Sequence, residues 1–320
     1  FFVQVFMLAI IQSAGGGDKA AGIEIVMTWL AIIGTIMLLI TFLTTRERIV
    51  PAAGQKTPLM KDLADLMKNR PWIIMLTLTT LVFVTLSIKG GAYVYYFSNY
   101  VDEQALHGLI DPITNSLAAV GMNFFGDDTI SAGFGLFNAG GIIFMIVGIS
   151  FSKKLADKYG KRDVFGWALF ISTLFILLFY LFPPKAVNLI FISQILHGFF
   201  YGITIPILWA MIADVADYSE WKNNRRATAI IFSAMMIGLK VGLSIGGALI
   251  TWILGMYNYI PNAVGEQTAG AIHGTKMLVS VYAAIPFLLS VGLLFFYEIN
   301  KKMEVKIEKE LFERRGSEER

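Results

Sequence analysis

Residues 227–256 read ATAIIFSAMMIGLKVGLSIGGALITWILGM, a run of 30 residues with a single charged side chain, Lys240. A helix of about 20 apolar residues is long enough to cross a hydrocarbon core of about 30 Å. The stretch is therefore predicted to be a transmembrane helix. Similar apolar runs recur along the chain, so that spans are predicted at 1–13 (partial), 23–43, 72–97, 131–151, 164–182, 187–212, 227–256 and 276–298.

The composition agrees with a membrane protein. Of the 320 residues, 56% are hydrophobic and 15% are charged, whereas a soluble domain carries about a quarter of charged residues. Because a span in lipid must satisfy its own backbone hydrogen bonds, the spans are expected to be helices. A soluble enzyme and a nucleic-acid-binding domain are excluded. Cysteine is absent and the three histidines are scattered, so neither a metal site nor a cofactor is expected.

The chain is predicted to contain parts of two helical bundles. It starts with an apolar run that has no Met and no basic segment before it, so we expect a span cut through its middle and a missing N-terminal part. Residues 1–43 would be the remnant of an N-terminal bundle, and the Pro-containing stretch 44–71 a linker. Residues 72–298 would form a six-span bundle, followed by a tail at 299–320. A short helix is expected around 112–121, within the acidic connection 98–130.

Lysine and arginine are distributed unevenly between the connections. The segments 44–70, 152–163, 213–226 and 299–320 hold 21 of the 26 basic residues, and the opposite set of connections holds three. Cytoplasmic connections are enriched in Lys and Arg. The first set, including the C-terminus, is therefore predicted to be cytoplasmic.

The span that contains Lys240 also carries small residues at four-residue spacing. Gly238, Gly242 and Gly246 form a seam suited to close helix packing. The segment 242–246 also matches the G-x-S-x-G pattern of hydrolases. That pattern requires a strand-to-helix turn, so the match is interpreted as chance, and the protein is not expected to be an enzyme.

Lys240 lies near mid-depth of its span, where a charge is costly and usually faces a cavity or an opposite charge. At helical spacing it shares a face with Ser233 and Ser244, away from the glycine seam. This polar stripe is interpreted as the lining of a substrate or cation pathway. The alternative is a lysine that only holds two helices together. No acidic residue lies near the middle of a span, so a carboxylate partner is expected in the missing N-terminal part.

Further polar residues lie within other spans. Gln194 and His197 share one helix face, where they could contact substrate or form a helix–helix hydrogen bond. Lys89 lies about 25 Å into its span at 1.5 Å per residue. It is expected to snorkel to the outer interface among tyrosines, with a contact in an outer vestibule as the alternative.

The connection after the span 187–212 is the most informative. Asp214, Asp217 and Glu220 recur at three-residue spacing on one helix face, and Arg225 and Arg226 follow. Carboxylates and guanidiniums at a membrane mouth can form ion pairs that close one side. A solvated turn is the alternative.

This stretch, Met211 to Arg226, closely resembles the signature of the glycoside–pentoside–hexuronide:cation symporter family, the melibiose permease-like branch of the major facilitator superfamily. Further resemblances follow along the chain. They are Lys240 with the glycines after it, the stretch from Gly255 to Asn262, Asn69-Arg-Pro-Trp72, and the tail around Glu310 to Arg315. The resemblance covers the chain from the family's fifth helix to its C-terminus. Met235 and Met236 depart from the polar residues found there in the melibiose permease.

The resemblance implies an all-α bundle of the major facilitator type, with about 7.5 transmembrane helices present. It implies symport of a sugar (glycoside, pentoside or hexuronide) with Na⁺ or H⁺ by alternating access, in a bacterial inner membrane and as a monomer. Asp214, Asp217, Glu220 and Arg226 match the family's cytoplasmic gate, joined by Lys161 or Arg162, and Lys240 matches a lysine near the sugar and cation sites. The cation ligands would lie in the missing N-terminal bundle. A non-transporting sensor or scaffold is the alternative, although it has no use for a charge at mid-depth.

Overall fold

The computed structural model describes residues 7, 10–11, 13–16, 18–45, 65–119, 128–223, 228–261 and 267–318. Within these ranges the regular structure is helical, and no strand occurs. The helices are α2 (Lys19–Thr44), α4 (Arg70–Asn99), α5 (Glu103–Ala119), α6 (Thr129–Tyr159), α7 (Lys161–Leu178), α8 (Val187–Asn223), α9 (Thr228–Met256), α10 (Ala269–Met277), a π-helical segment (Leu278–Tyr282), α11 (Ala283–Leu294) and α12 (Lys301–Glu318). The predicted all-helical architecture is confirmed.

Six stretches among the described residues are long and apolar enough to cross a membrane. They are Ala20–Thr44, Arg70–Asn99, Thr129–Tyr159, Val187–Asn223, Thr228–Met256 and Ala269–Leu294. The sequence predicted a further span at 164–182. The corresponding helix α7 has 18 residues, and its first turn contains Lys161, Arg162 and Asp163. With three charged residues in so short a helix, α7 is not among the stretches that are apolar enough to cross a membrane.

Polar side chains and one glycine fix where helices begin. The Asn69 side chain accepts a hydrogen bond from the Trp72 amide at 3.3 Å, and the Asp128 carboxylate accepts one from the Ser131 amide at 3.1 Å. Such caps satisfy amides that have no partner within the helix. Gly160 separates α6 from α7 with a φ of 93°, a backbone conformation that favours glycine.

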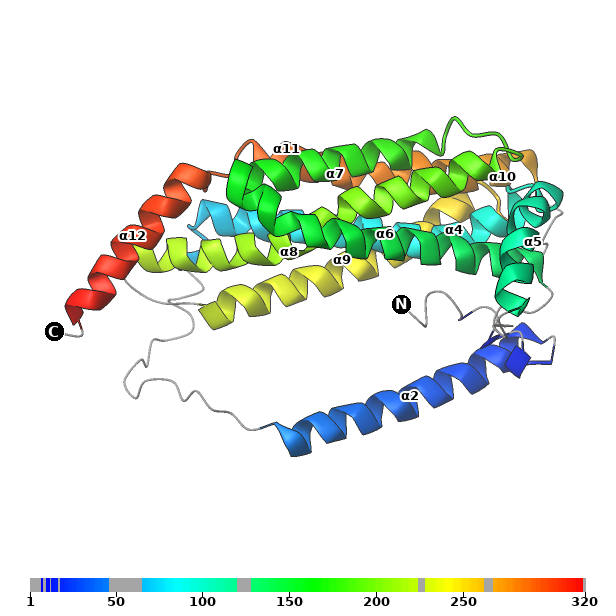
Figure 1. The fold of residues 1–320 in the computed structure, drawn as a ribbon, viewed down its shortest axis with the longest axis horizontal. Helices are drawn as coiled ribbons and strands as arrows, with labels where there is room; N and C mark the ends of the chain where they lie inside the picture. Colours follow the sequence, from blue (N-terminus) through cyan, green and yellow to red (C-terminus); the bar gives the residue numbers. More distant parts are fainter. Residues whose placement is uncertain are drawn as a thin grey trace.

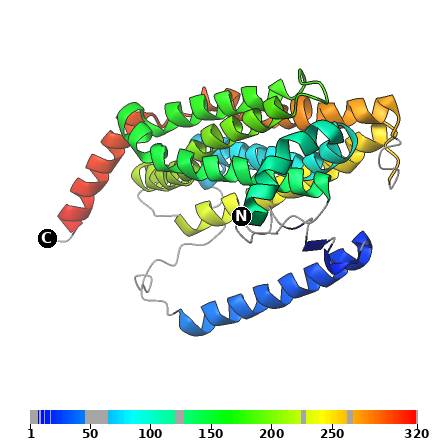
Figure 2. The same ribbon diagram turned by 45° about the vertical axis from the view of Figure 1, so that its right-hand side comes forward.

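The helices α4 and α6 to α11 pack side by side around a shared core, and α5 lies across one end of them (Figures 1 and 2). α6 packs along α8, α9 lies along α4, and α7 lies between α8 and α11. Glycines bring α6 and α8 close together, because a Cβ on Gly198 or Gly202 would collide with the backbone of α6. Phe97, Phe137 and Phe179 fill the core at one end, where their rings meet edge to face.

α2 and α12 lie outside this bundle. Figure 1 shows α2 apart from the other helices, and large apolar side chains such as Leu38 and Phe42 are exposed along it. α12 extends beyond the bundle at the end where α8 stops, and its Ile307 and Leu311 are buried. This end, where α4 and α7 begin and α6 and α8 finish, is called the charged end below.

Several predicted boundaries differ from the structure. The helix expected around 112–121 begins earlier, at Glu103, and contains Pro112. The last span starts at Ala269 and ends at Leu294, rather than at 276 and 298, and residues 295–299, which are apolar except for Glu298, follow the end of the helix. Most of the partial span 1–13 and of the linker 44–71 lies outside the described residues.

Candidate functional site

The glycine seam of α9 packs against α4. A Cβ on Gly242 would collide with the carbonyl oxygen of Thr80, and one on Gly246 would lie 2.6 Å from the carbonyl oxygen of Val84. A Cβ on Gly238 would instead meet the side chain of Leu76, with Cδ1 at 2.8 Å. Small residues at this spacing allow helix backbones to approach closely. The seam thus determines which face of α9 is buried and which is left free.

Lys240, Ser233 and Ser244 lie on the free face of α9, and all three are exposed. Ser244 donates a hydrogen bond from Oγ to the carbonyl oxygen of Lys240 at 2.9 Å. No carboxylate in the described ranges forms an ion pair with the Lys240 ammonium. Ile237 and Ile245 are also exposed on this helix. The free face of α9 therefore carries both apolar and polar groups around one charge. A surface that packs against a second layer of helices has this mixed composition.

Gln194 and His197 lie elsewhere, on the buried side of α8. His197 contacts Ser172 of α7, with its Nδ1 at 2.8 Å from the Ser172 Oγ. Gln194 accepts a hydrogen bond from the Tyr93 hydroxyl of α4 at 3.3 Å. The structure does not bring these two residues into contact with Lys240. Their observed contacts are hydrogen bonds between helices, which is one of the two interpretations that the sequence allowed.

The prediction that Lys89 snorkels to the outer interface is wrong. Its side chain is buried, and its Nζ contacts Nε2 of His197 while lying 5.4 Å from the centre of the Tyr93 ring. The sequence could not show which way this face of the helix is turned. In the structure, the face of α4 that carries Lys89 is turned toward α8.

An ion-pair network lies at the charged end. The Lys161 Nζ is 2.6 Å from Oδ1 of Asp214 and 2.9 Å from Oε1 of Glu304, and all three side chains are largely buried. Burial lowers the pKa of the Lys161 ammonium, but its hydrogen bonds to Asp214 and Glu304 outweigh this effect, and the pKa is raised above its usual value. The Lys161 ammonium therefore stays protonated near neutral pH and links α7, α8 and α12.

The other residues matched to the gate are placed as follows. Asp217 lies one turn further along α8. Burial raises the pKa of the Asp214 carboxyl group, and the nearby charge of Asp217 raises it further. Glu220 follows at the same spacing. Arg162 bonds instead to its neighbour Asp163 at 2.9 Å and to the carbonyl oxygen of Tyr297 at 3.3 Å. Between the two basic residues that the sequence left open, Lys161 is the one that reaches Asp214. Arg226 lies outside the described residues.

The sequence did not assign the residues of α12 to this network. Besides Glu304, Glu310 accepts a hydrogen bond from the indole nitrogen of Trp221 at 2.6 Å. The sequence feature that could have indicated this docking is the apolar pair Ile307 and Leu311, which are four residues apart and both buried. An apolar pair at that spacing in a charged tail is typical of a helix that docks on a surface.

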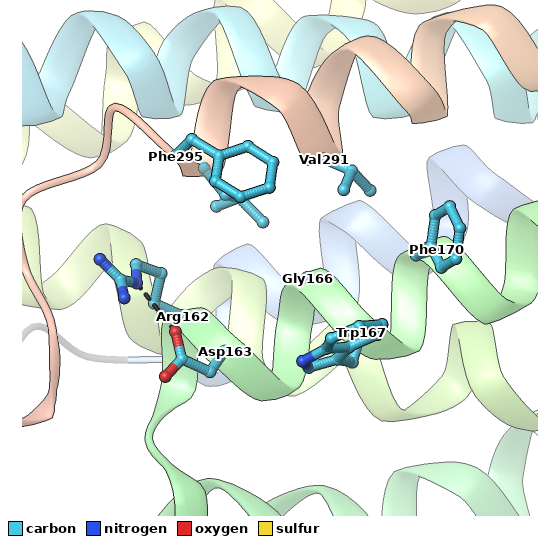
Figure 3. Close-up of a pocket in the computed structure, with 8 residues that line it drawn as sticks. Arg162, Asp163, Gly166, Trp167, Phe170, Val291 and Phe295 are labelled. Carbon is cyan, nitrogen blue, oxygen red and sulfur yellow. Dashed lines mark hydrogen bonds and ion pairs between the residues drawn. The ribbon is translucent and has the colours of Figure 1, made fainter.

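A groove of about 520 Å³ lies between α7 and α11, close to the charged end. Figure 3 shows the pair Arg162–Asp163 at one end of it and Trp167, Phe170, Val291 and Phe295 along its walls. Trp167 and Phe295 are strongly exposed, so the groove opens to the outside of the bundle. It includes neither Lys240 nor the buried residues of α8.

The described residues contain no cluster of three or more His, Cys, Asp or Glu side chains that could hold a metal ion. The residues described above offer single charges, ion pairs, hydroxyl groups, an amide and an imidazole. Such groups can bind a polar solute or an ion and can exchange ion-pair partners.

Comparison with known proteins gives relatives with the names of transporters. The chain is 27% identical over 301 residues to the putative glycoside/cation symporter YagG of Escherichia coli K12. The matched region covers 94% of this chain and 59% of that protein. It is 28% identical over 286 residues to the inner membrane symporter YicJ of the same organism, covering 89% of this chain and 56% of that protein.

A third relative is the isoprimeverose transporter of Lactiplantibacillus pentosus, 24% identical over 304 residues, which are 93% of this chain and 57% of that protein. The chain thus spans somewhat less than three fifths of the length of each of these relatives. A family model described as MFS/sugar transport protein matches residues 1–126 and 113–301. With nearly the whole chain matched, and with a helical fold that has several stretches long and apolar enough to cross a membrane, the protein belongs to this family.

Proposed function

We propose that the chain is the larger part of a secondary active transporter that carries a sugar together with Na⁺ or H⁺. The sugar would be a glycoside, a pentoside or a hexuronide. Transport would follow alternating access, in which two bundles rock around a site near the middle of the membrane. The names of the relatives, a glycoside/cation symporter and an isoprimeverose transporter among them, support this class of solute.

The observation that carries the proposal is the free face of α9. Lys240 lies twelve residues into the helix, which is about 18 Å at 1.5 Å per residue. At that depth a charge is expensive unless water or an opposite charge meets it. The glycine seam turns Lys240 away from the packing contacts of its own bundle. We infer that Lys240, Ser233 and Ser244 line the central cavity, where a sugar hydroxyl or a carboxylate from the other bundle would meet them.

The charged end would be the inward gate. Lys161 joins α7 to α8 and α12 through Asp214 and Glu304. When the charged end opens, such partly buried ion pairs can be exchanged for contacts with water. The excess of Lys and Arg on this side, 21 against three, supports a cytoplasmic location of the gate and of the C-terminus. We place the protein in a bacterial inner membrane.

The remaining components would come from the same protein. Residues 1–43 would belong to an N-terminal bundle that closes over the free face of α9 and supplies the cation ligands. The functional unit would then be a monomer of two bundles joined through 44–71, in contact with lipid and with no further partner.

The proposal is tested by counterflow in proteoliposomes that contain the full-length transporter. Labelled glycosides, pentosides and hexuronides are offered in Na⁺ buffer and in Na⁺-free buffer at several pH values. We expect exchange of one solute class, accelerated by one of the two cations. A protein that exchanges none of the panel under any condition would be better described as a sensor or scaffold of this fold.

A further inference from the structure

The buried contact between Lys89 and His197 is unusual because both groups are basic. Nζ of Lys89, on α4, contacts Nε2 of His197, on α8. The two residues are only 7% and 3% exposed. Two bases in direct contact inside a membrane bundle cannot both carry a charge at tolerable cost. It is therefore necessary to establish which nitrogen atoms of the pair carry a hydrogen.

The other side of the imidazole ring determines where the protons lie. Nδ1 of His197 is 3.1 Å from the backbone carbonyl oxygen of Ser172, and a carbonyl oxygen can only accept. Nδ1 therefore carries a hydrogen. The Ser172 hydroxyl, 2.8 Å from Nδ1, can accept from it as well while donating to the carbonyl oxygen of His197 at 3.3 Å. The neutral ring then offers the lone pair of Nε2 to Lys89.

One proton can thus occupy either side of the contact. With an ammonium at Lys89, an N–H of Nζ donates to Nε2; with an imidazolium at His197, Nε2–H donates to the amine of Lys89. Both arrangements carry one positive charge. If that proton leaves for bulk water, the amine still has an N–H that can donate to Nε2, so the pair becomes neutral without losing its hydrogen bond.

The surroundings supply no permanent counter-charge. Among the described residues, no carboxylate forms an ion pair with Lys89 or His197. The ionisable groups that face the pair are two phenols, Tyr93 beneath the ammonium at 5.4 Å and Tyr201, which stacks on the His197 ring with 5.9 Å between ring centres.

The neighbouring helices add no further ionisable contact to the pair. α7 contributes Ser172, and α11 contributes Phe287, stacked on Tyr201. α6 presents Gly141, which leaves room for the Gln194 amide, and α9 meets α4 nearby through Ile250 against Gly91. Lys240 of α9 is exposed on the opposite face of that helix. Lys276, at the end of α10, lies over Tyr100 and Tyr180 instead.

From this geometry we propose that Lys89 and His197 form a buried proton-binding site of the bundle, which takes up one proton from water and releases it again. The shared hydrogen bond favours keeping the proton, and the lack of a carboxylate favours releasing it. These opposing contributions make the site exchangeable rather than permanently charged. The contact joins α4 to α8, so its charge acts on two of the central helices. The site does not depend on which solute the transporter carries.

Nuclear magnetic resonance can observe the site directly. The full chain, labelled with ¹⁵N in lysine and histidine side chains, is reconstituted in bilayers and followed from about pH 5 to about pH 10. We expect one lysine Nζ signal and one histidine ring signal to change together, with one midpoint and a one-proton step, because they report the same proton. The measurement has no transport readout, so it can fail or succeed independently of the proposed symport.

Two variants assign the signals. Lys89→Met keeps the aliphatic chain and removes the amine, and it should abolish the shared transition, including its histidine part. Lys276→Met, which removes a lysine that contacts other aromatic rings, should leave the transition unchanged. Signals that stay constant over the whole pH range, or that titrate with two unrelated midpoints, would overturn the proposal. If Lys89→Met does not fold, the titration of the unaltered chain still decides between these outcomes.

Discussion

At the scale of single residues, charge and depth decide what Lys240 can do. An ammonium near mid-membrane is stable only where water or an opposite charge reaches it. The described part of the chain provides no carboxylate partner for it. A lysine that served only to hold α9 in its own bundle would lie on the seam side, where Gly238, Gly242 and Gly246 meet α4. Its place on the free face favours a role toward the second bundle.

We predict that Lys240→Ala abolishes cation-driven uptake by the full-length transporter. The partner carboxylate would lose its counter-charge and would bind the cation without responding to the solute. Lys240→Arg should restore little, because a planar guanidinium does not replace a compact ammonium. The measurement is uptake of labelled sugar at matched surface expression.

The matched control is Lys185→Ala, which removes an exposed lysine from the connection between α7 and α8. It should transport normally. Accumulation close to normal in Lys240→Ala would remove Lys240 from the mechanism and leave it as a packing residue.

A second residue-scale prediction concerns Asp214. Asp214→Asn removes the charge that holds Lys161 at 2.6 Å, and a hydrogen bond to a charged group contributes about 1.5–3 kcal/mol. The closed state of the charged end should be weakened by a similar amount, which is about tenfold or more in the equilibrium. A cysteine at the buried position Ser219 should then be modified about tenfold faster than in the parent, as measured by maleimide labelling.

Asp163→Asn is the control for that experiment. The Asp163 carboxylate is 55% exposed and pairs with its neighbour Arg162, and surface pairs of this kind contribute about 0–1 kcal/mol. Labelling should stay at the parental rate. Equal rates in Asp214→Asn and in the parent would favour the solvated turn over the gate.

At the scale of the element, the contact between α4 and α9 rests on backbone approach. We predict that Gly242→Ala lowers the free energy of unfolding by about 1–3 kcal/mol, because its methyl group must displace the backbone of α4 at Thr80. Thermal unfolding of the purified protein in detergent measures the change.

Gly247→Ala is the corresponding control on the same helix. There an added Cβ meets nothing nearer than the Ser87 hydroxyl at 3.8 Å, and alanine is the better helix former by up to about 1 kcal/mol. Its stability should be unchanged or slightly higher. A loss of stability that was equal in the two variants would mean that the seam does not limit the helix distance.

At the scale of the whole molecule, the distribution of basic residues predicts the orientation. These 320 residues contain no cysteine, so a single cysteine introduced among them has no competing thiol within this chain. With an impermeant maleimide, Lys185→Cys should be labelled in intact cells, and Lys302→Cys only after the cells are permeabilised. Both positions are exposed, so that the membrane alone accounts for a difference. The reverse pattern would contradict the cytoplasmic placement of the charged end.

Much of the fold could be predicted from the sequence because lipid imposes simple rules. The apolar run around Lys240 had to be a helix, since no other backbone structure satisfies its hydrogen bonds in an isolated span. Boundaries were less certain: α8 continues through its acidic residues to Asn223, and α10 begins at Ala269. Apolar composition marks only the part of a helix that lies in lipid, whereas hydrogen bonding and caps determine where the helix ends.

The sequence by itself determined the helical class, the position of Lys240 inside a long apolar helix and the sharing of one face by Asp214, Asp217 and Glu220, because these follow from composition and from the pitch of one helix. Only the tertiary structure decided what lies opposite each face. In the folded chain, Lys161 contacts both Asp214 and Glu304. The glycine seam packs against α4, and Lys89 is buried against His197. Such pairings depend on how helices far apart in the sequence rotate and pack against one another, and helical periodicity contains no information about a neighbour.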